Sequence, residues 1–156
     1  MADNVSNTIA GILTQARDEI RANMQTQNIN ASGRTSAALQ VRQNGSRIEL
    51  VKVAGENAPF QTLQYGRACG KVPAGFYYII KQWTRDKGLS FPNETERGKF
   101  AYFAARKIAR EGTRRHEKPN TQVYSEPIKK AAEEIGQEVR RYILQSVQAT
   151  IKENFR

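Results

Sequence analysis

The residue types that most often carry chemistry are scarce in this chain. It has one histidine, His116, and one cysteine, Cys69, while its acidic residues are scattered mainly along expected helix faces. Catalysis requires titratable groups held close together, and the spacing identifies no base beside either residue. A single thiol forms no internal disulfide and cannot complete a four-ligand zinc site. The sequence therefore predicts a solvated loop histidine, a structural thiol and no enzymatic activity.

Two weaker patterns also fail to indicate a reaction. Gly66, Gly70 and Gly75 share one segment, but their spacing matches neither the phosphate-binding loop nor the dinucleotide fingerprint. Glu133 and Glu134 are adjacent on an expected helix, so their side chains point in different directions and do not form an acid and base pair. We expect no cofactor and no bound metal.

A cluster of basic residues is the most informative chemical feature. Between residues 97 and 118 the chain has eight basic residues and two glutamates, eight minus two, for a net charge of +6. The basic residues are Arg97, Lys99, Arg106, Lys107, Arg110, Arg114, Arg115 and Lys118. If about six of them contacted phosphates, the logarithm of the binding constant for duplex DNA would fall with the logarithm of the salt concentration with a slope of about −5. The alternative interpretation is a solvated helix face.

Aromatic residues occur in the same segment. Phe100 and Phe103 follow helical spacing, which predicts that they pack in the core rather than stack on bases. Tyr102 lies off that apolar stripe and is a candidate interface residue. Tyr65 and Arg67, from a segment with irregular spacing, are the other two candidates.

Length and charge limit the classes of protein. The 156 residues fit one domain, residues 1–156, and the formal net charge is +10. That charge suits an acidic partner, and nucleic acid, an anionic membrane and an acidic protein surface are all compatible with it. Apolar runs are too short for a membrane span, and residues 1–6 lack signal-peptide features. We expect an unprocessed, soluble protein made inside the cell, with no membrane partner.

The first third of the chain predicts a helix followed by a hairpin. Apolar residues at steps of three and four indicate an amphipathic helix over residues 5–24, and the polar run 25–36 indicates a loop. Asn44-Gly45 lies between two alternating segments and predicts a β-hairpin turn. The alternation slips near residue 51, which indicates a bulge or a strand buried on both faces.

The middle of the chain predicts two helices. One covers residues 76–87 and ends at Gly88, and the other covers residues 94–111 between an Asn93 cap and Gly112. Residues 60–66 fit a strand or a short turn of helix. Residues 113–120 read as a polar loop and residues 122–124 as a short β-like piece.

A long C-terminal helix is expected after Ser125, which we predict to be its cap. Its apolar stripe is Ile128, Ala132, Ile135, Val139, Tyr142, Ile143, Val147 and Ile151. A stripe of that length predicts a spine that crosses the whole domain. The expected fold is α+β: an antiparallel sheet with a β-hairpin, packed by the N-terminal helix, two middle helices and the long C-terminal helix.

Three segments together resemble the neck proteins of tailed bacteriophages, also described as head-tail connector, tail-completion or minor tail components. They are Ala31-Ser32-Gly33-Arg34-Thr35-Ser36; Leu63-Gln64-Tyr65-Gly66-Arg67; and Trp83 with Lys87-Gly88-Leu89, then Ala101 to Ala105, Lys107, Ile108 and Gly112-Thr113. The resemblance spans about residues 8–150. The chain departs from the family pattern by inserting the two middle helices.

The resemblance implies a non-enzymatic ring of six or twelve copies in the neck of a virion, made in the host cytoplasm. The ring would join the portal or adaptor protein to the tail proteins and surround packaged double-stranded DNA without reading its sequence. The alternative is a free, basic, nucleoid-type protein, which would bind duplex DNA tightly as a single chain. A third option, an enzyme, would need His116, Cys69 and a carboxylate to converge in one pocket.

Overall fold

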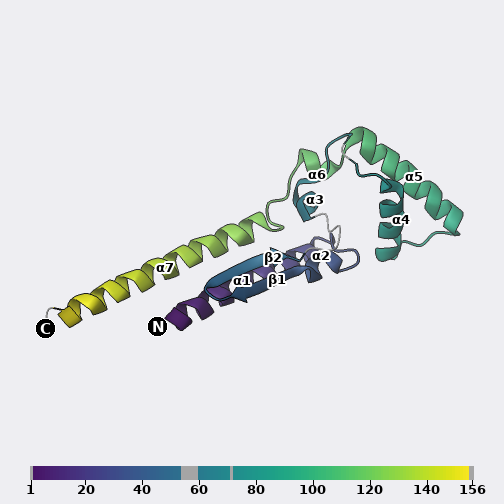
Figure 1. Ribbon diagram of the computed structural model, residues 1–156. Coiled ribbons are helices and arrows are strands. Elements are labelled where there is room, and N and C mark those ends of the chain that lie inside the picture. Colours follow the sequence, from purple (N-terminus) through teal and green to yellow (C-terminus); the bar gives the residue numbers. More distant parts are fainter. Residues whose placement is uncertain (1, 54–59, 71, 155–156) are drawn as a thin grey trace.

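The computed structural model describes residues 2–53, 60–70 and 72–154 and has the predicted α+β arrangement (Figure 1). Its elements are α1 (Ala2–Thr26), α2 (Arg34–Ala37), β1 (Leu39–Asn44), β2 (Arg47–Lys52), α3 (Phe60–Tyr65), α4 (Phe76–Asp86), α5 (Glu94–Glu111), α6 (Arg114–Glu117) and α7 (Ser125–Asn154). We call residues 2–52 together with the first part of α7, residues 125–135, the body, and α4 with α5 the helical hairpin. Figure 1 shows the helical hairpin at one end of the elongated body and the end of α7 at the other.

The β-hairpin forms with a different turn from the one expected. Strand pairing runs regularly from Leu39 opposite Lys52 to Asn44 opposite Arg47, so the turn is Gly45-Ser46 and the strands contain no bulge. Gly45 has a φ of 59°. A two-residue turn with glycine first needs positive φ only at that position, which leaves Asn44 free to remain in the strand. The prediction of an Asn44-Gly45 turn is therefore wrong. Of the two interpretations of the slip near residue 51, the bulge is wrong, and consecutive residues 48–51 are instead half-buried on both faces of β2.

The core lies where the C-terminal half of α1 meets the hairpin and the turn before α7. Ile20, Met24, Leu39 and Val123 form its buried cluster. Val123 belongs to the segment predicted to be β-like, but residues 121–124 form a turn. The Val123 amide donates to the Asn120 carbonyl, and its side chain fills the core. The strand prediction is wrong because Val123 lies in a turn. Its side chain is buried in the core, although its backbone is not part of a sheet.

The helical hairpin follows its sequence signals closely. The Asn93 side chain accepts a hydrogen bond from the Glu96 amide at 2.9 Å, which caps the start of α5. At the end of α4 the Leu89 amide donates to the Thr84 carbonyl and the Gly88 amide to Arg85, the paired bonds of a Schellman motif. Residues 60–66, for which strand and helix were both open, contain helix α3.

The C-terminal helix does not cross the domain. Its 30 residues correspond to about 45 Å of helix. Only its first part packs on α1, and Figure 1 shows the rest projecting beyond the N-terminus of α1. The prediction of a buried spine is wrong because the body is too short to cover a stripe of that length.

Candidate functional site

The predicted basic cluster is spread over α5, α6 and the segment after α6, and two of its members have structural roles. Arg97 donates to Glu94 at 3.0 Å and to the Thr84 hydroxyl at 3.1 Å, and its side chain is only 16% exposed. Its guanidinium also lies 4.9 Å from the centre of the Phe91 ring. Arg115 donates to the Leu63 carbonyl and so joins α6 to α3.

Three further members pair with acids on α5 itself. Lys99 lies 2.8 Å from Glu96, and Lys107 lies 3.9 Å from Glu111. Arg110 also pairs with Glu111, and this hydrogen bond holds the pKa of the Glu111 carboxyl below its usual range. Such pairs lower the positive potential that the helix presents to a partner.

The remaining three members are Arg106, Arg114 and Lys118. Within residues 2–53, 60–70 and 72–154, no carboxylate lies within ion-pair distance of any of them. All three are exposed. Arg106 donates to the Tyr102 hydroxyl at 3.5 Å, a marginal hydrogen bond. These three cations are therefore the part of the cluster available to an external anion.

One candidate interface residue, Arg67, lies in a seam, which we define as the contact of residues 66–70 with residues 109–116, and another, Tyr65, lies beside it. The Arg67 amide donates to the Thr113 hydroxyl at 2.8 Å, and the Thr113 amide donates to the Arg67 carbonyl at 2.9 Å. The Arg67 guanidinium lies 5.3 Å from the centre of the Phe76 ring. Tyr65 packs edge-on against Tyr124, with ring centres 6.1 Å apart, and burial raises the pKa of Tyr124.

Two glycines make this seam possible. A Cβ at Gly66, whose φ is 67°, would lie 2.5 Å from the His116 amide nitrogen. A Cβ at Gly112 would lie 2.7 Å from the Arg67 carbonyl oxygen. Two backbone segments therefore touch where only glycine fits. The segment quoted for its resemblance, residues 63–67, thus joins the helical hairpin to the body.

Sequence reasoning missed the role of Gln64. Its side chain is fully buried, and its Oε1 accepts hydrogen bonds from the Tyr124 and Ser125 amides at 3.3 and 3.1 Å. Its Nε2 donates to the Ser125 hydroxyl at 2.6 Å. Gln64 therefore satisfies the Tyr124 and Ser125 amides at the start of α7. Ser125 is the first residue of α7 rather than the residue before it, so the prediction that Ser125 caps the helix is wrong. No local signal reveals this, because Gln64 and α7 are about sixty residues apart.

His116 and Cys69 are both exposed. His116 Nδ1 lies 3.3 Å from the Tyr65 carbonyl oxygen. Among the described residues, no group of three or more His, Cys, Asp or Glu side chains could hold a metal ion. Nothing in the geometry of either residue indicates a reaction.

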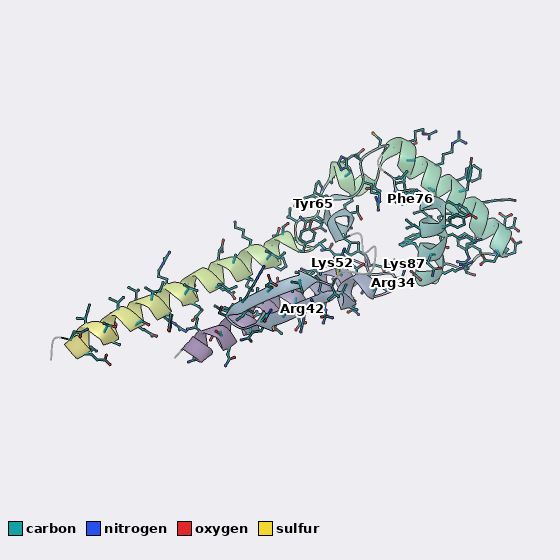
Figure 2. All side chains as sticks on the ribbon, viewed as in Figure 1. Arg34, Arg42, Lys52, Tyr65, Phe76 and Lys87 are labelled. Atoms are coloured by element: carbon teal, nitrogen blue, oxygen red, sulfur yellow. The ribbon has the colours of Figure 1, made fainter. Side chains whose placement is uncertain are left out.

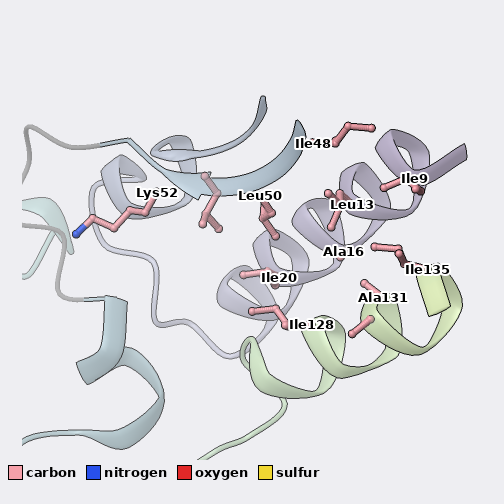
Figure 3. Close-up of a pocket in the computed structure, with 12 residues that line it drawn as sticks. Ile9, Leu13, Ala16, Ile20, Ile48, Leu50, Lys52, Ile128, Ala131 and Ile135 are labelled. Carbon is pink, nitrogen blue, oxygen red and sulfur yellow. The ribbon is translucent and has the colours of Figure 1, made fainter. Parts of the chain in front are cut away.

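The body has an apolar groove with a cavity volume of about 430 Å³ (Figure 3). It is lined by Ile9, Leu13, Ala16, Ile20, Leu39, Ile48, Leu50, Lys52, Ile128, Ala131, Ala132 and Ile135. Figure 3 shows the hairpin residues reaching toward α1 from one side and the α7 residues from the other. The lining offers aliphatic surface and a single charged side chain, Lys52, so it suits an apolar occupant.

Two other apolar surfaces are exposed. The aromatic face of the helical hairpin comprises Tyr78, Trp83, Phe100, Tyr102 and Phe103. The predicted burial of Phe100 and Phe103 is wrong, since Phe103 is 65% exposed. The reason is that Ala101 is the buried residue of α5, so α5 turns a small residue inward and its phenylalanines outward.

The second exposed surface is the α7 stripe, which we define as Val139, Ile143, Leu144, Val147 and Ile151. These side chains are between 37% and 56% exposed. All belong to the part of α7 beyond the groove-lining residues (Figure 1).

Comparisons with known proteins give no guide to these surfaces. No family model, curated protein or solved structure matches the chain. No described helix has the length and apolarity needed to cross a membrane.

Proposed function

We propose that this chain is a non-enzymatic structural subunit of a tailed-bacteriophage neck, where copies form a ring that joins the portal or adaptor protein to the tail. The observation that carries the proposal is its exposed area. The chain exposes 10934 Å², whereas a folded monomer of 17.6 kDa is expected to expose about 7,900 Å². The difference, about 3,000 Å², corresponds to several interfaces of about 800 Å² per partner. The shape is that of a subunit completed by its neighbours.

The kinds of residue in the exposed area favour a subunit of an assembly over a free monomer. The aromatic residues of the helical hairpin and the α7 stripe expose large apolar side chains, and exposed apolar surface is typical of protein interfaces. They lie at opposite ends of the molecule (Figure 1). A closed ring requires two different patches on each subunit, besides surfaces for the adjacent neck proteins, and the chain exposes separate apolar surfaces for these contacts.

The net positive charge supports a position beside anionic partners. The net charge is +10, and Arg106, Arg114 and Lys118 present cations without carboxylate partners in the described part of the chain. In the proposed ring these three side chains face packaged DNA or acidic surfaces of adjacent neck proteins. Their spread over α5, α6 and the following segment suits non-specific attraction to phosphates rather than base recognition.

Electron microscopy of the purified full chain tests the proposal. Closed rings of six or twelve copies are expected, and a particle that remains a monomer at every concentration would contradict it. Mobility shifts with duplex DNA test the nucleoid-type alternative. That alternative requires tight binding by the single chain at about 0.15 M salt, whereas the neck subunit binds weakly until it is assembled.

A charge-matched pair of variants tests the cations. Replacing Arg106, Arg114 and Lys118 with Ser should weaken DNA retention by assembled rings and flatten its salt dependence. The control variant, with Arg42, Arg47 and Lys129 replaced by Ser, removes the same charge from the body and should retain DNA. Equal loss in both variants would show that only net charge matters. Arg115 is left unchanged because it holds α6 to α3.

A further inference from the structure

We propose that the α7 stripe of one copy docks into the groove of a second copy of this chain. The proposal rests on the assembly proposed above and names the two surfaces that form it. Helices with one apolar face commonly bind by lying in an apolar groove. Both halves of such a pair are present here on separate parts of one molecule.

The groove is open because its walls do not close over α1. The hairpin and the first part of α7 each pack on α1, and Figure 3 shows them on different sides of it. Ile9, Leu13 and Ala16 of α1 lie between them, with Ile48 on the hairpin wall and Ile135 on the α7 wall. A further helix placed there would cover aliphatic side chains from three elements at once.

The α7 stripe has the chemistry to fill that space. Val139, Ile143, Val147 and Ile151 recur every four residues, and Leu144 lies beside them. Side chains four residues apart lie on one face of a helix, so the stripe is continuous. Like the groove lining, it is aliphatic, and it contains none of the aromatic residues that dominate the helical hairpin.

The two surfaces also match in length. The α1 floor runs from Ile9 to Ile20, and the distance between these residues along the helix is about 17 Å. The stripe runs from Val139 to Ile151, a distance of about 18 Å. A helix laid along the floor would therefore place the whole stripe against the groove.

The stripe cannot occupy the groove of its own chain. Ile135 already lines the groove, and Val139 follows one turn later in the same unbroken helix. Figure 1 shows α7 continuing away from the body after that point. Another chain must therefore supply the helix that fills each groove.

A second copy is the occupant that the exposed area favours. Each copy would donate one stripe and receive another, so it would form two interfaces from two different patches. Two interfaces of ordinary size remove about 1,600 Å² from each copy, which lies within the excess of about 3,000 Å². Repetition of this contact gives a closed ring or a filament.

Cysteine cross-linking between two differently tagged full-length chains tests the proposal. Both carry Cys69→Ser; one carries Val147→Cys in the stripe and the other Ile48→Cys in the groove. A short bismaleimide should link them in a mixture and leave each one largely unlinked alone. A control mixture of Val147→Cys with Phe103→Cys, on the aromatic face, should give at least tenfold less product. Circular dichroism of each variant verifies its fold.

The outcomes separate this proposal from the proposed function. Rings with no link between positions 147 and 48 would overturn the docking and leave the neck function standing. Cross-links formed by Val147→Cys alone would also overturn it, because they indicate pairing of α7 with α7. A wild-type chain that remains a monomer at every concentration would overturn both. As a check without cross-linker, Ile143→Glu should weaken self-association at least tenfold, and Phe103→Glu should not.

Discussion

The body and the helical hairpin are both built from amphipathic helices, yet they are stabilised in different ways. In the body, Ile20 and Met24 of α1 are buried against Leu39 and Val123. In the helical hairpin, Phe100 and Phe103 face outward, and the described buried residues are Phe76, Thr84 and Ala101. The comparison shows that an apolar stripe in the sequence predicts which face of a helix is apolar. It does not predict whether other residues of the same chain bury that face.

In the helical hairpin, polar contacts hold the helices together where the body has a buried apolar cluster. Glu94 at the start of α5 lies 2.8 Å from Arg85 and 3.3 Å from Lys81, both on α4. The helical hairpin meets the body through Arg34, 2.9 Å from Asp86, and Lys87, which donates to Asn28 Oδ1 at 2.8 Å. Figure 2 shows Arg34 and Lys87 close together at this contact. Exposed ion pairs stabilise weakly, so we expect the helical hairpin to open more readily than the body.

Removing one core methyl-rich side chain should reveal the largest difference between the regions. Ile20→Ala should lower the free energy of unfolding by about 2–5 kcal/mol, because Ile20 is fully buried and a cavity would remain. Ile79→Ala, on the half-exposed face of α4, should change it by less than about 0.5 kcal/mol. Guanidinium unfolding at a concentration where the chain is monomeric gives both values. Equal losses would contradict the contrast.

The second effect concerns the contact between α3 and α7. Gln64→Leu should destabilise the fold by about 1–3 kcal/mol, because the Tyr124 and Ser125 amides lose a buried acceptor. Hydrogen exchange at the start of α7 should accelerate with it. Gln137→Leu, at an exposed position of α7, is the matched control and should leave exchange there unchanged. Unaltered exchange in Gln64→Leu would show that the start of α7 does not depend on this side chain.

Replacing glycine with alanine should change the stability of the fold in opposite directions at two positions. Gly66→Ala should destabilise by more than about 1 kcal/mol, since φ is positive and the added methyl would meet backbone atoms of the seam. Gly136→Ala lies inside α7 with open space around it, and should stabilise by up to about 1 kcal/mol. Thermal unfolding of both variants measures the signs. Two changes of the same sign would argue against the close backbone contact at the seam.

The smallest expected effect is a dependence of the stability of the helical hairpin on pH. The hydrogen bond from Arg85 holds the pKa of Glu94 below its ordinary value of 4.5. Its contribution to stability is therefore present above the unfolded pKa and is lost as the pH falls through the lower folded pKa. Amide exchange in α4 and α5 should accelerate over that range, and Glu94→Gln should remove much of this pH dependence. An unchanged profile in Glu94→Gln would assign the effect to another carboxyl.

Local signals predicted the longer elements well because their causes are local, but they missed the short helices α2 and α6, which lie in segments predicted to be loops. The Asn93 cap, the Gly88 end of α4 and the Gly112 end of α5 each depend on residues within one turn. The exposure of Phe103 and the role of Gln64 depend on residues distant in sequence, so periodicity could not predict them. The sequence placed Tyr65 and Arg67 as candidate interface residues, and the structure places both at or beside the seam. Which surface contacts another molecule is not encoded in one chain's periodicity.

The mass of the full chain in solution tests the central claim most directly: that neighbouring copies cover the apolar surface left open on the monomer. Sedimentation equilibrium over a wide concentration range should yield a species at a whole multiple of 17.6 kDa, and Ile143→Glu should shift the population toward 17.6 kDa. A wild-type chain that sediments at 17.6 kDa at every concentration would contradict the claim.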